Sequence, residues 1–242
     1  MIPAGNFGAA KRGDMQSDDH PVRRSWQRRR LLDRVAERIA GLAGGRAMLV
    51  GIDGVDGAGK TVFADELAEV LQSRRMPVVR ASVDGFHNPR TVRYRRGRSS
   101  PEGFFLDSYD YPAMRELLLE PLRPEGSRQI VRAVYDVATE QPVQADLETV
   151  AEDSVLVFDG IFLHRTELRD DWDVSAFLDV GFEVSIPRGA ARGYGDPDPA
   201  AASNRRYVEG QRLYLARCKP YQHATFVIDN EDLDAPTLVH ER

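Results

Sequence analysis

An eight-residue segment at positions 54–61 limits, more than any other part of the sequence, what this chain can fold into. It reads Gly-Val-Asp-Gly-Ala-Gly-Lys-Thr, which fits the phosphate-binding pattern G-x-x-x-x-G-K-[ST]. That pattern requires a strand before it and a helix after it. Residues 47–53 form an apolar run typical of a buried parallel strand, and residues 61–74 carry apolar side chains at helical spacing with carboxylates between them. The segment therefore predicts an α/β fold built around a phosphate loop.

The residue types in this segment suit the binding of a polyphosphate. The glycines let the backbone turn tightly and bring its N–H groups close to an anion at the start of a helix. We expect Lys60 to reach the β- and γ-phosphates of ATP and the Thr61 hydroxyl to bind Mg²⁺. An ordinary glycine-rich turn is the alternative, and the predicted strand and helix argue against it. The expected nucleotide-binding residues are Gly54, Asp56, Gly57, Ala58, Gly59, Lys60, Thr61 and Val62.

Length, charge and cysteine content narrow the class of protein. The 242 residues, 42% of them hydrophobic, are enough for one large domain with a sizeable core. A net charge of -5 favours neither nucleic acid nor an anionic membrane as a partner, and Cys218 has no second cysteine to bridge. We expect a disordered tail at residues 1–24, a single domain at residues 25–242 and a cytoplasmic location. The protein is expected to bind no nucleic acid or membrane, and a homo-oligomer stays open.

Four more apolar runs, at residues 77–83, 154–160, 174–180 and 224–229, are expected to complete a five-stranded parallel sheet. Asp84 follows the first of these runs and Asp159 stands near the end of the second. Ligands of open parallel sheets bind at the carboxyl ends of the strands. Asp84 is therefore the candidate base that accepts a proton from an acceptor hydroxyl, although capping of the next turn is an equal alternative. Asp159 is a candidate for contact with Mg²⁺, directly or through water.

Other segments give weaker predictions. Residues 25–42 should form a helix whose arginines face solvent, and residues 205–216 a second helix. The arginine-rich residues 90–98 are expected to form a loop, either solvated or gripping an anionic substrate. Residues 129–137 predict a strand that includes part of a small hairpin. Several glycines and prolines in residues 183–199 predict a mobile connection rather than a packed helix, with Arg188 and Arg192 placed to neutralise a transferring phosphate.

Taken in order, five segments resemble the landmarks of the uridine kinase and phosphoribulokinase family. These are the phosphate loop, Ser-Val-Asp-Gly-Phe-His at residues 82–87, Asp-Ser-Tyr-Asp-Tyr-Pro at 107–112, Val-Tyr-Asp at 134–136 and Phe-Asp-Gly-Ile-Phe at 158–162. The resemblance runs from about residue 47 to residue 230. It implies a P-loop kinase of the nucleoside kinase type, with a five-stranded parallel sheet between helices, ATP on the phosphate loop and a lid at about residues 183–204.

The resemblance also implies roles for single residues. Asp84 matches the family's catalytic base, and Phe86 and His87 beside it are expected to help bind the acceptor. Asp110 matches an acid that holds ribose hydroxyls in uridine kinases, and Tyr135 matches an aromatic residue near the nucleobase.

Two more positions fit the pattern and three depart from it. Arg188 and Arg192 fall where lid arginines occur, whereas Ser185 stands where another arginine is usual. Asp159 replaces the more common Glu. Glu140 stands where uridine kinases place a histidine that reads the pyrimidine, and a carboxylate offers different hydrogen bonds.

These observations predict a kinase that uses ATP and Mg²⁺ to phosphorylate a hydroxyl of a small molecule. Lys60, Asp84, Arg188 and Arg192 are its expected catalytic residues, and uridine or cytidine is the leading acceptor. Pantothenate, a sugar or a sugar phosphate is the nearest alternative, because the nucleobase-reading histidine is replaced. A nucleotide-dependent switch that changes the shape of a partner surface is the second alternative.

Overall fold

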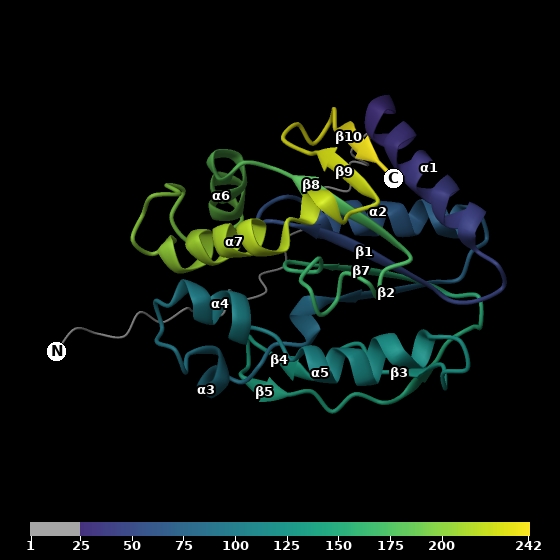
Figure 1. Ribbon diagram of the computed structural model, residues 1–242, viewed down its shortest axis with the longest axis horizontal. Helices are drawn as coiled ribbons and strands as arrows, with labels where there is room; N and C mark the ends of the chain where they lie inside the picture. The colour runs from purple at the N-terminus through teal and green to yellow at the C-terminus, as the bar shows by residue number, and fades with distance from the viewer. Residues whose placement is uncertain (1–24) are drawn as a thin grey trace, which may run out of the picture.

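A computed structural model describes residues 25–242, so the tail expected at residues 1–24 lies outside the described part of the chain. Its centre is a six-stranded sheet in the order β10-β9-β8-β1-β7-β2 (Figure 1). The strands of this sheet are β1 Met48–Gly54, β2 Val78–Ser82, β7 Val155–Gly160, β8 Val174–Asp179, β9 Phe226–Asp229 and β10 Thr237–Glu241.

The five expected strands are all present, and each pairs in parallel with its neighbour. The sixth strand, β10, was not predicted. It pairs antiparallel with β9 at the edge of the sheet, and its register shifts between Leu238 and His240. This irregular edge strand has mostly exposed side chains, so its sequence lacks the apolar run that marks the buried strands.

Side chains alternate across the central strand and create two cores. Met48, Val50 and Ile52 pack on one face with apolar residues of two helices, α1 Trp26–Leu42 and α2 Lys60–Ser73. Leu49 points to the other face, where the core includes residues from the short helices after β2 and from α7 Arg205–Cys218. The sheet is therefore covered by helices on both sides, as a parallel sheet requires.

The remaining elements are short and lie mostly between β2 and β7. The helical ones are η1 Val83–Gly85, α3 Arg90–Arg93, α4 Pro101–Asp107, α5 Tyr111–Met114, the π-helical η2 Arg115–Leu119, η3 Glu120–Leu122, α6 Phe182–Ala191 and η4 Pro220–Gln222. Two small ladders pair β3 Gln129–Ile130 with β6 Glu148–Thr149 and β4 Tyr135–Asp136 with β5 Gln141–Pro142. The expected hairpin is present, but the single strand expected at residues 129–137 is wrong, because residues 131–134 separate two pairs.

Three local predictions are wrong because tertiary packing overrides the local sequence signal. Residues 182–191 form helix α6 despite Pro187, since Ser185 and Ile186 are buried and hold the segment in place. The arginine-rich segment begins with the helical turn α3. Arg28 is buried rather than solvated, and its guanidinium donates to Glu66, Asn230 and the Leu233 carbonyl.

Among residues 25–242, no helix combines the length and the apolar character that a membrane span needs.

Candidate active site

The phosphate loop joins the end of β1 to the start of α2, as the sequence predicts. Gly57 and Gly59 adopt φ angles of 77° and 89°, a backbone conformation that residues with a Cβ rarely adopt. Gly57 is also pressed against α6, because a Cβ added there would lie 2.0 Å from the Ser185 carbonyl oxygen. Helix α6 therefore sits directly on the phosphate loop, and only a glycine fits between them.

Hydrogen bonds with Asn230, Gln211 and Lys60 hold the backbone of the phosphate loop in place. The Asn230 amide donates to the Ala58 carbonyl over 2.7 Å, and Asn230 in turn accepts from Arg28. The Gln211 side-chain oxygen accepts from the Asp56 backbone N–H at 2.6 Å. The Lys60 ammonium donates to the Val55 carbonyl at 2.8 Å, so this lysine lies over its own loop. Helix α7 and the segment after β9 thus contact the loop directly, and helix α1 supports it through Asn230.

Thr61 and Asp159, the two expected metal ligands, lie side by side. The Thr61 hydroxyl donates to one Asp159 carboxylate oxygen over 2.7 Å, and Arg80 donates to the other at 2.9 Å. Adjacent ligands of an octahedral Mg²⁺ at about 2.0–2.1 Å lie about 3 Å apart, so this oxygen pair fits two neighbouring positions. Among residues 25–242, no three His, Cys, Asp or Glu side chains gather around a point. Hydroxyl, phosphate and water ligands would therefore have to complete such a site.

Asp84, the candidate base, lies close to His87 and Tyr109. Its side chain is exposed, and its backbone carbonyl contacts the His87 ring nitrogen Nδ1 at 2.9 Å. The His87 ring packs 4.6 Å from the ring of Tyr109. Burial raises the pKa of the Tyr109 phenol well above its ordinary value, and the nearby carboxylates of Asp84 and Asp56 raise it further. Tyr109 is thus a protonated donor beside the candidate base, a role that sequence reasoning missed.

Phe86 and Asp110, both expected to bind the acceptor, make contacts that stabilise the fold around the site. Phe86 is fully buried and packs against Phe158, so its side chain supports the site from below instead of facing an acceptor. Asp110 caps helix α5, because one of its carboxylate oxygens accepts from the Ala113 N–H at 3.0 Å. The Asp110 backbone N–H donates to the Phe86 carbonyl over 2.7 Å, which brings the acid next to the segment that carries Asp84.

Glu140 and Tyr135 come together with Arg93, a residue that the sequence did not single out. Arg93 donates to one carboxylate oxygen of Glu140, and the Tyr135 hydroxyl donates to the other at 3.0 Å. Burial would raise the pKa of Glu140, but these two hydrogen bonds and the charge of Arg93 outweigh it and lower the pKa. Glu140 is therefore ionised and engaged at both oxygens.

The two lid arginines do not reach the phosphate loop in this structure. Arg188 donates to the backbone carbonyls of Asn230 and Glu231, and Arg192 lies exposed at the end of α6. Their catalytic role stays a prediction. Val62, expected to bind nucleotide, is exposed in the first turn of α2.

A buried hydrogen-bond network lies directly beneath the loop. One Asp53 oxygen accepts from the Gly54 N–H, and the other accepts from the His164 backbone and ring and from the Tyr214 hydroxyl. The far ring nitrogen of His164 contacts the Ser175 hydroxyl at 2.9 Å. Asp53, the residue before the phosphate loop, was assigned only to a strand from sequence. Its place there fixes the point where the loop leaves β1.

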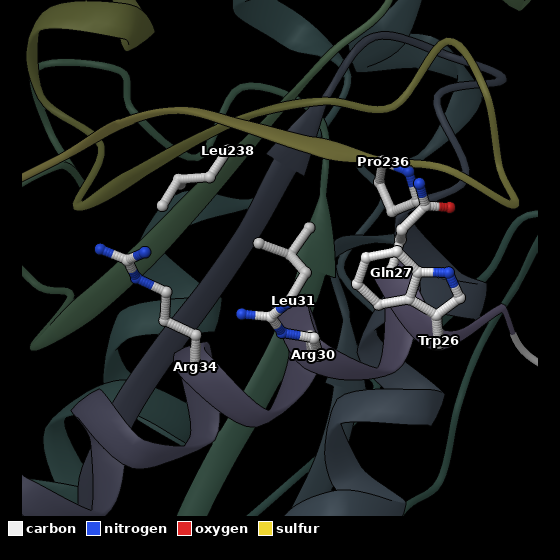
Figure 2. Close-up of a pocket in the computed structure, with 7 residues that line it drawn as sticks. All are labelled: Trp26, Gln27, Arg30, Leu31, Arg34, Pro236 and Leu238. Carbon is white, nitrogen blue, oxygen red and sulfur yellow. The ribbon is translucent and has the colours of Figure 1, made fainter.

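The surface groove between α1 and β10 contains none of these residues. Figure 2 shows the side chains that line it, which are Trp26, Gln27, Arg30, Leu31, Arg34, Pro236 and Leu238. Lys60, Asp84 and Asp159 lie instead near the carboxyl ends of β1, β2 and β7.

Comparison with known proteins places this geometry in a family. The model of the phosphoribulokinase / uridine kinase family matches residues 49–196. The chain belongs to this family. Its relatives include proteins named as kinases of uridine, of pantothenate and of nicotinamide riboside.

The individual relatives are distant. The uridine kinase of Chlamydia pneumoniae is 25% identical over 147 residues, 60% of this chain and 63% of that protein. Human nicotinamide riboside kinase 1 is 27% identical over 154 residues, 63% of this chain and 69% of that protein. The alignment thus spans less than two thirds of the Chlamydia protein's length.

Solved structures share the fold. A possible uridine kinase from Bacillus stearothermophilus has a TM-score of 0.65 at 22% identity, over 82% of this chain and 97% of that one. The D-glycerate 3-kinase of Cryptococcus neoformans has a TM-score of 0.55 at 13% identity, over 89% of this chain and 98% of that one.

The close contact between Gly57 and α6 gives a first testable prediction. Gly57→Ala should weaken binding of Mg-ATP at least about tenfold, because the added methyl displaces α6 or distorts the loop. Gly193→Ala is the matched control, since Gly193 also has a positive φ, of 88°, but nothing within 4 Å of its added Cβ. Titration with a fluorescent ATP analogue compares the two. Equal losses of affinity would contradict a specific role for the contact with α6.

Asp56 gives a prediction about pH. Burial raises the pKa of this carboxyl, Lys60 opposes the rise and Asp84 adds to it. A raised pKa in the folded state makes the charged form costly, so stability is lost as the pH climbs through that raised value. Asp56→Asn should therefore be more thermally stable than the wild type at pH 7, and the difference should shrink toward zero below the ordinary pKa of 3.8.

Asp136 provides a control of opposite sign for that experiment. Hydrogen bonds from the backbone, the Ala138 N–H foremost, lower the pKa of its carboxyl. Asp136→Asn should thus lose stability at pH 7, and the loss should fade as the pH drops through the lowered value. Melting temperatures from pH 3.5 to pH 7.5 are compared for the three proteins. The same sign for both variants at pH 7 would refute the assignment.

Proposed function

We propose that this protein transfers the γ-phosphoryl group of ATP to a hydroxyl of a small molecule. The observation that carries the proposal is the pairing of Thr61 with Asp159 at the phosphate loop, on the same sheet edge as Asp84. Lys60 and the loop N–H groups would hold the phosphates. Bound by Thr61 and Asp159, Mg²⁺ would neutralise charge on the transferring group.

Asp84 would supply the base in this reaction. Its carboxylate accepts the proton of the acceptor hydroxyl while the hydroxyl oxygen bonds to the γ-phosphorus and the bond to the β-phosphate oxygen breaks. ADP leaves with that oxygen. Tyr109 would donate a hydrogen bond to Asp84 or to the acceptor and so orient the acceptor hydroxyl. His87, packed on Tyr109, would line the same acceptor site.

Uridine and cytidine are the first acceptors to test, because several relatives are named uridine kinases. Glu140 argues for a wider panel, since an ionised carboxylate can only accept hydrogen bonds, whereas a histidine at this position could also donate one to a pyrimidine edge. Pantothenate, sugars and sugar phosphates are the alternatives, and one relative is named a pantothenate kinase.

The proposal is tested by ADP release from Mg-ATP in the presence of each of these compounds. Strong stimulation by at least one small hydroxyl compound is expected. If none stimulates turnover and only a macromolecule does, the protein is a nucleotide-dependent switch and the kinase proposal fails.

A further inference from the structure

Four guanidinium groups surround the ring of Tyr94, the residue that follows α3. Their central carbons lie 5.8 Å, 5.6 Å, 5.4 Å and 4.9 Å from the ring centroid for Arg90, Arg93, Arg98 and Arg206 respectively. We call these five residues the Tyr94 cluster. Each contact is a favourable cation–π interaction, but four like charges gathered on one ring also repel one another.

In the part of the chain that the structure describes, Glu140 is the only carboxylate that forms an ion pair with an arginine of the cluster. Glu140 pairs with Arg93, whereas within residues 25–242 neither Arg90 nor Arg98 forms an ion pair. Arg206 is 6% exposed and donates only to backbone carbonyls, at positions 93, 97, 98 and 100. Carbonyls satisfy N–H groups without neutralising the charge. The cluster therefore holds an excess of positive charge.

Two buried donors in the cluster also have no acceptor among the described residues. These are the Nε atoms of Arg93 and Arg206, whose residues are 8% and 6% exposed. Buried N–H groups are nearly always hydrogen-bonded, and a charged donor is costly to leave unpaired. The nearby Asp107 does not serve them, because it already pairs with Arg95 and Arg96. These Nε atoms are closed to solvent, so they add to the cost of the cluster without being ligand contacts themselves. The excess positive charge reaches the surface at the exposed Arg90 and Arg98, and it points to an anion that is not part of the chain.

The cluster borders the space where the acceptor is expected. Glu140 links Arg93 to Tyr135, and Tyr135 forms a β-bridge with Phe86, two residues after Asp84. On the other side, Tyr207 lies close enough to Tyr94 and to Asp56 of the phosphate loop for both to raise its pKa, after the larger effect of burial. Figure 1 shows α4 between α7 and α3, and α3 lies near the β4 and β5 hairpin, where Arg93 pairs with Glu140.

We propose that the acceptor carries a phosphate or carboxylate group, which binds Arg90 and Arg98 at the Tyr94 cluster while the acceptor hydroxyl lies at Asp84. This inference rests on the proposed kinase function. Arginine suits the task because its planar fork bonds two oxygens of such a group at once. The arginine-rich segment then divides by role: Arg93, Arg95 and Arg96 pair with carboxylates of the chain, and Arg90 and Arg98 remain for the ligand.

The test compares matched acceptors that differ only by the anionic group. Ribose 5-phosphate is paired with ribose, and glycerate with glycerol, in the ADP-release assay on the full-length protein. We expect turnover with an anionic member and little with its neutral partner. In Arg90→Gln/Arg98→Gln, the KM for the anionic acceptor should rise about tenfold or more with kcat nearly unchanged, because the lost contacts act in binding. Both side chains are exposed, so the substitutions spare the core.

Arg29→Gln/Arg38→Gln is the charge-matched control, because it removes two exposed arginines from α1. It should leave the KM unchanged. An anionic acceptor whose KM is equally insensitive to both double variants would overturn the inference, as would a neutral acceptor that outperforms its anionic partner. Inorganic phosphate should compete with the anionic acceptor; if it instead stimulates a neutral one, the cluster binds an effector and the acceptor assignment is wrong.

A failure of the proposed function would look different. If no acceptor stimulates turnover, equilibrium dialysis measures binding of inorganic phosphate to protein whose phosphate loop is filled with Mg-ADP. Binding that is lost in Arg90→Gln/Arg98→Gln and retained in the α1 variant would reject the kinase reaction but leave the anion site. Absence of binding would reject the site as well.

Discussion

Asp84→Asn is expected to lower phosphoryl transfer by about 10²–10⁴-fold, the usual contribution of a positioned acid or base. The amide keeps the size of the side chain but cannot take the proton of the acceptor hydroxyl. Asp84 is exposed, so the fold should tolerate the change. Turnover is measured by ADP release with the best acceptor, and Mg-ATP affinity by titration should stay close to that of the wild type.

Asp153→Asn is the control for this loss, since it removes an exposed acid from the turn before β7, away from the strand ends at which the acceptor is expected. It should behave as the wild type in both assays. Full turnover by Asp84→Asn would remove Asp84 from proton transfer and leave its proximity to Tyr109 without a catalytic meaning. A loss of ATP affinity equal to the loss of turnover would instead assign Asp84 to nucleotide binding.

Asp53→Asn is expected to cost about 3 kcal/mol of unfolding free energy, because an amide group would face donors that now share a carboxylate. The Asp53 carboxylate accepts from the Gly54 N–H over 2.7 Å and from the His164 ring at the same distance, and also from Tyr214. All three side chains of this network are buried. Urea unfolding at pH 7 measures the loss from the shift of the midpoint.

Asp179→Asn is the matched comparison, because Asp179 ends the neighbouring strand β8. Its carboxylate accepts a long and therefore weak hydrogen bond, of 3.3 Å, from the Tyr221 hydroxyl. Its cost should stay within about 0.5 kcal/mol, as for most partly exposed sites. Similar losses for the two variants would show that the network beneath the loop contributes no more than an ordinary strand end.

The features that the sequence predicted well are those determined by local pattern and parallel topology. The phosphate-loop pattern fixes the positions of Lys60 and Thr61 relative to β1, and parallel strands bring their carboxyl ends to one edge. The contact between Thr61 and Asp159, 98 residues apart, follows from those two facts and is present. The candidate base Asp84 lies at the same edge, and its chemistry stays a prediction.

The features that escaped prediction depend on how distant segments pack. Arg93 and Glu140 are 47 residues apart and meet because the short hairpin of β4 and β5 carries Glu140 in its turn. Arg28 looks like one of several surface arginines, and contacts with Glu66 of α2 and with the segment after β9 make it a buried partner. Pro187 suggests a break in the chain, yet packing on the phosphate loop holds α6 in place around it. No local pattern carries this information.

The supports of the phosphate loop extend beyond the part of the chain that the family model matches. Arg28 in α1 and Asn230 after β9 together hold the Ala58 carbonyl, and both lie outside the family-matched residues 49–196. A fragment cut to that matched region would contain the whole phosphate loop and lose both ends of its support. Engineers who trim or transplant this domain would therefore need to keep both flanks, helix α1 and the segment after β9.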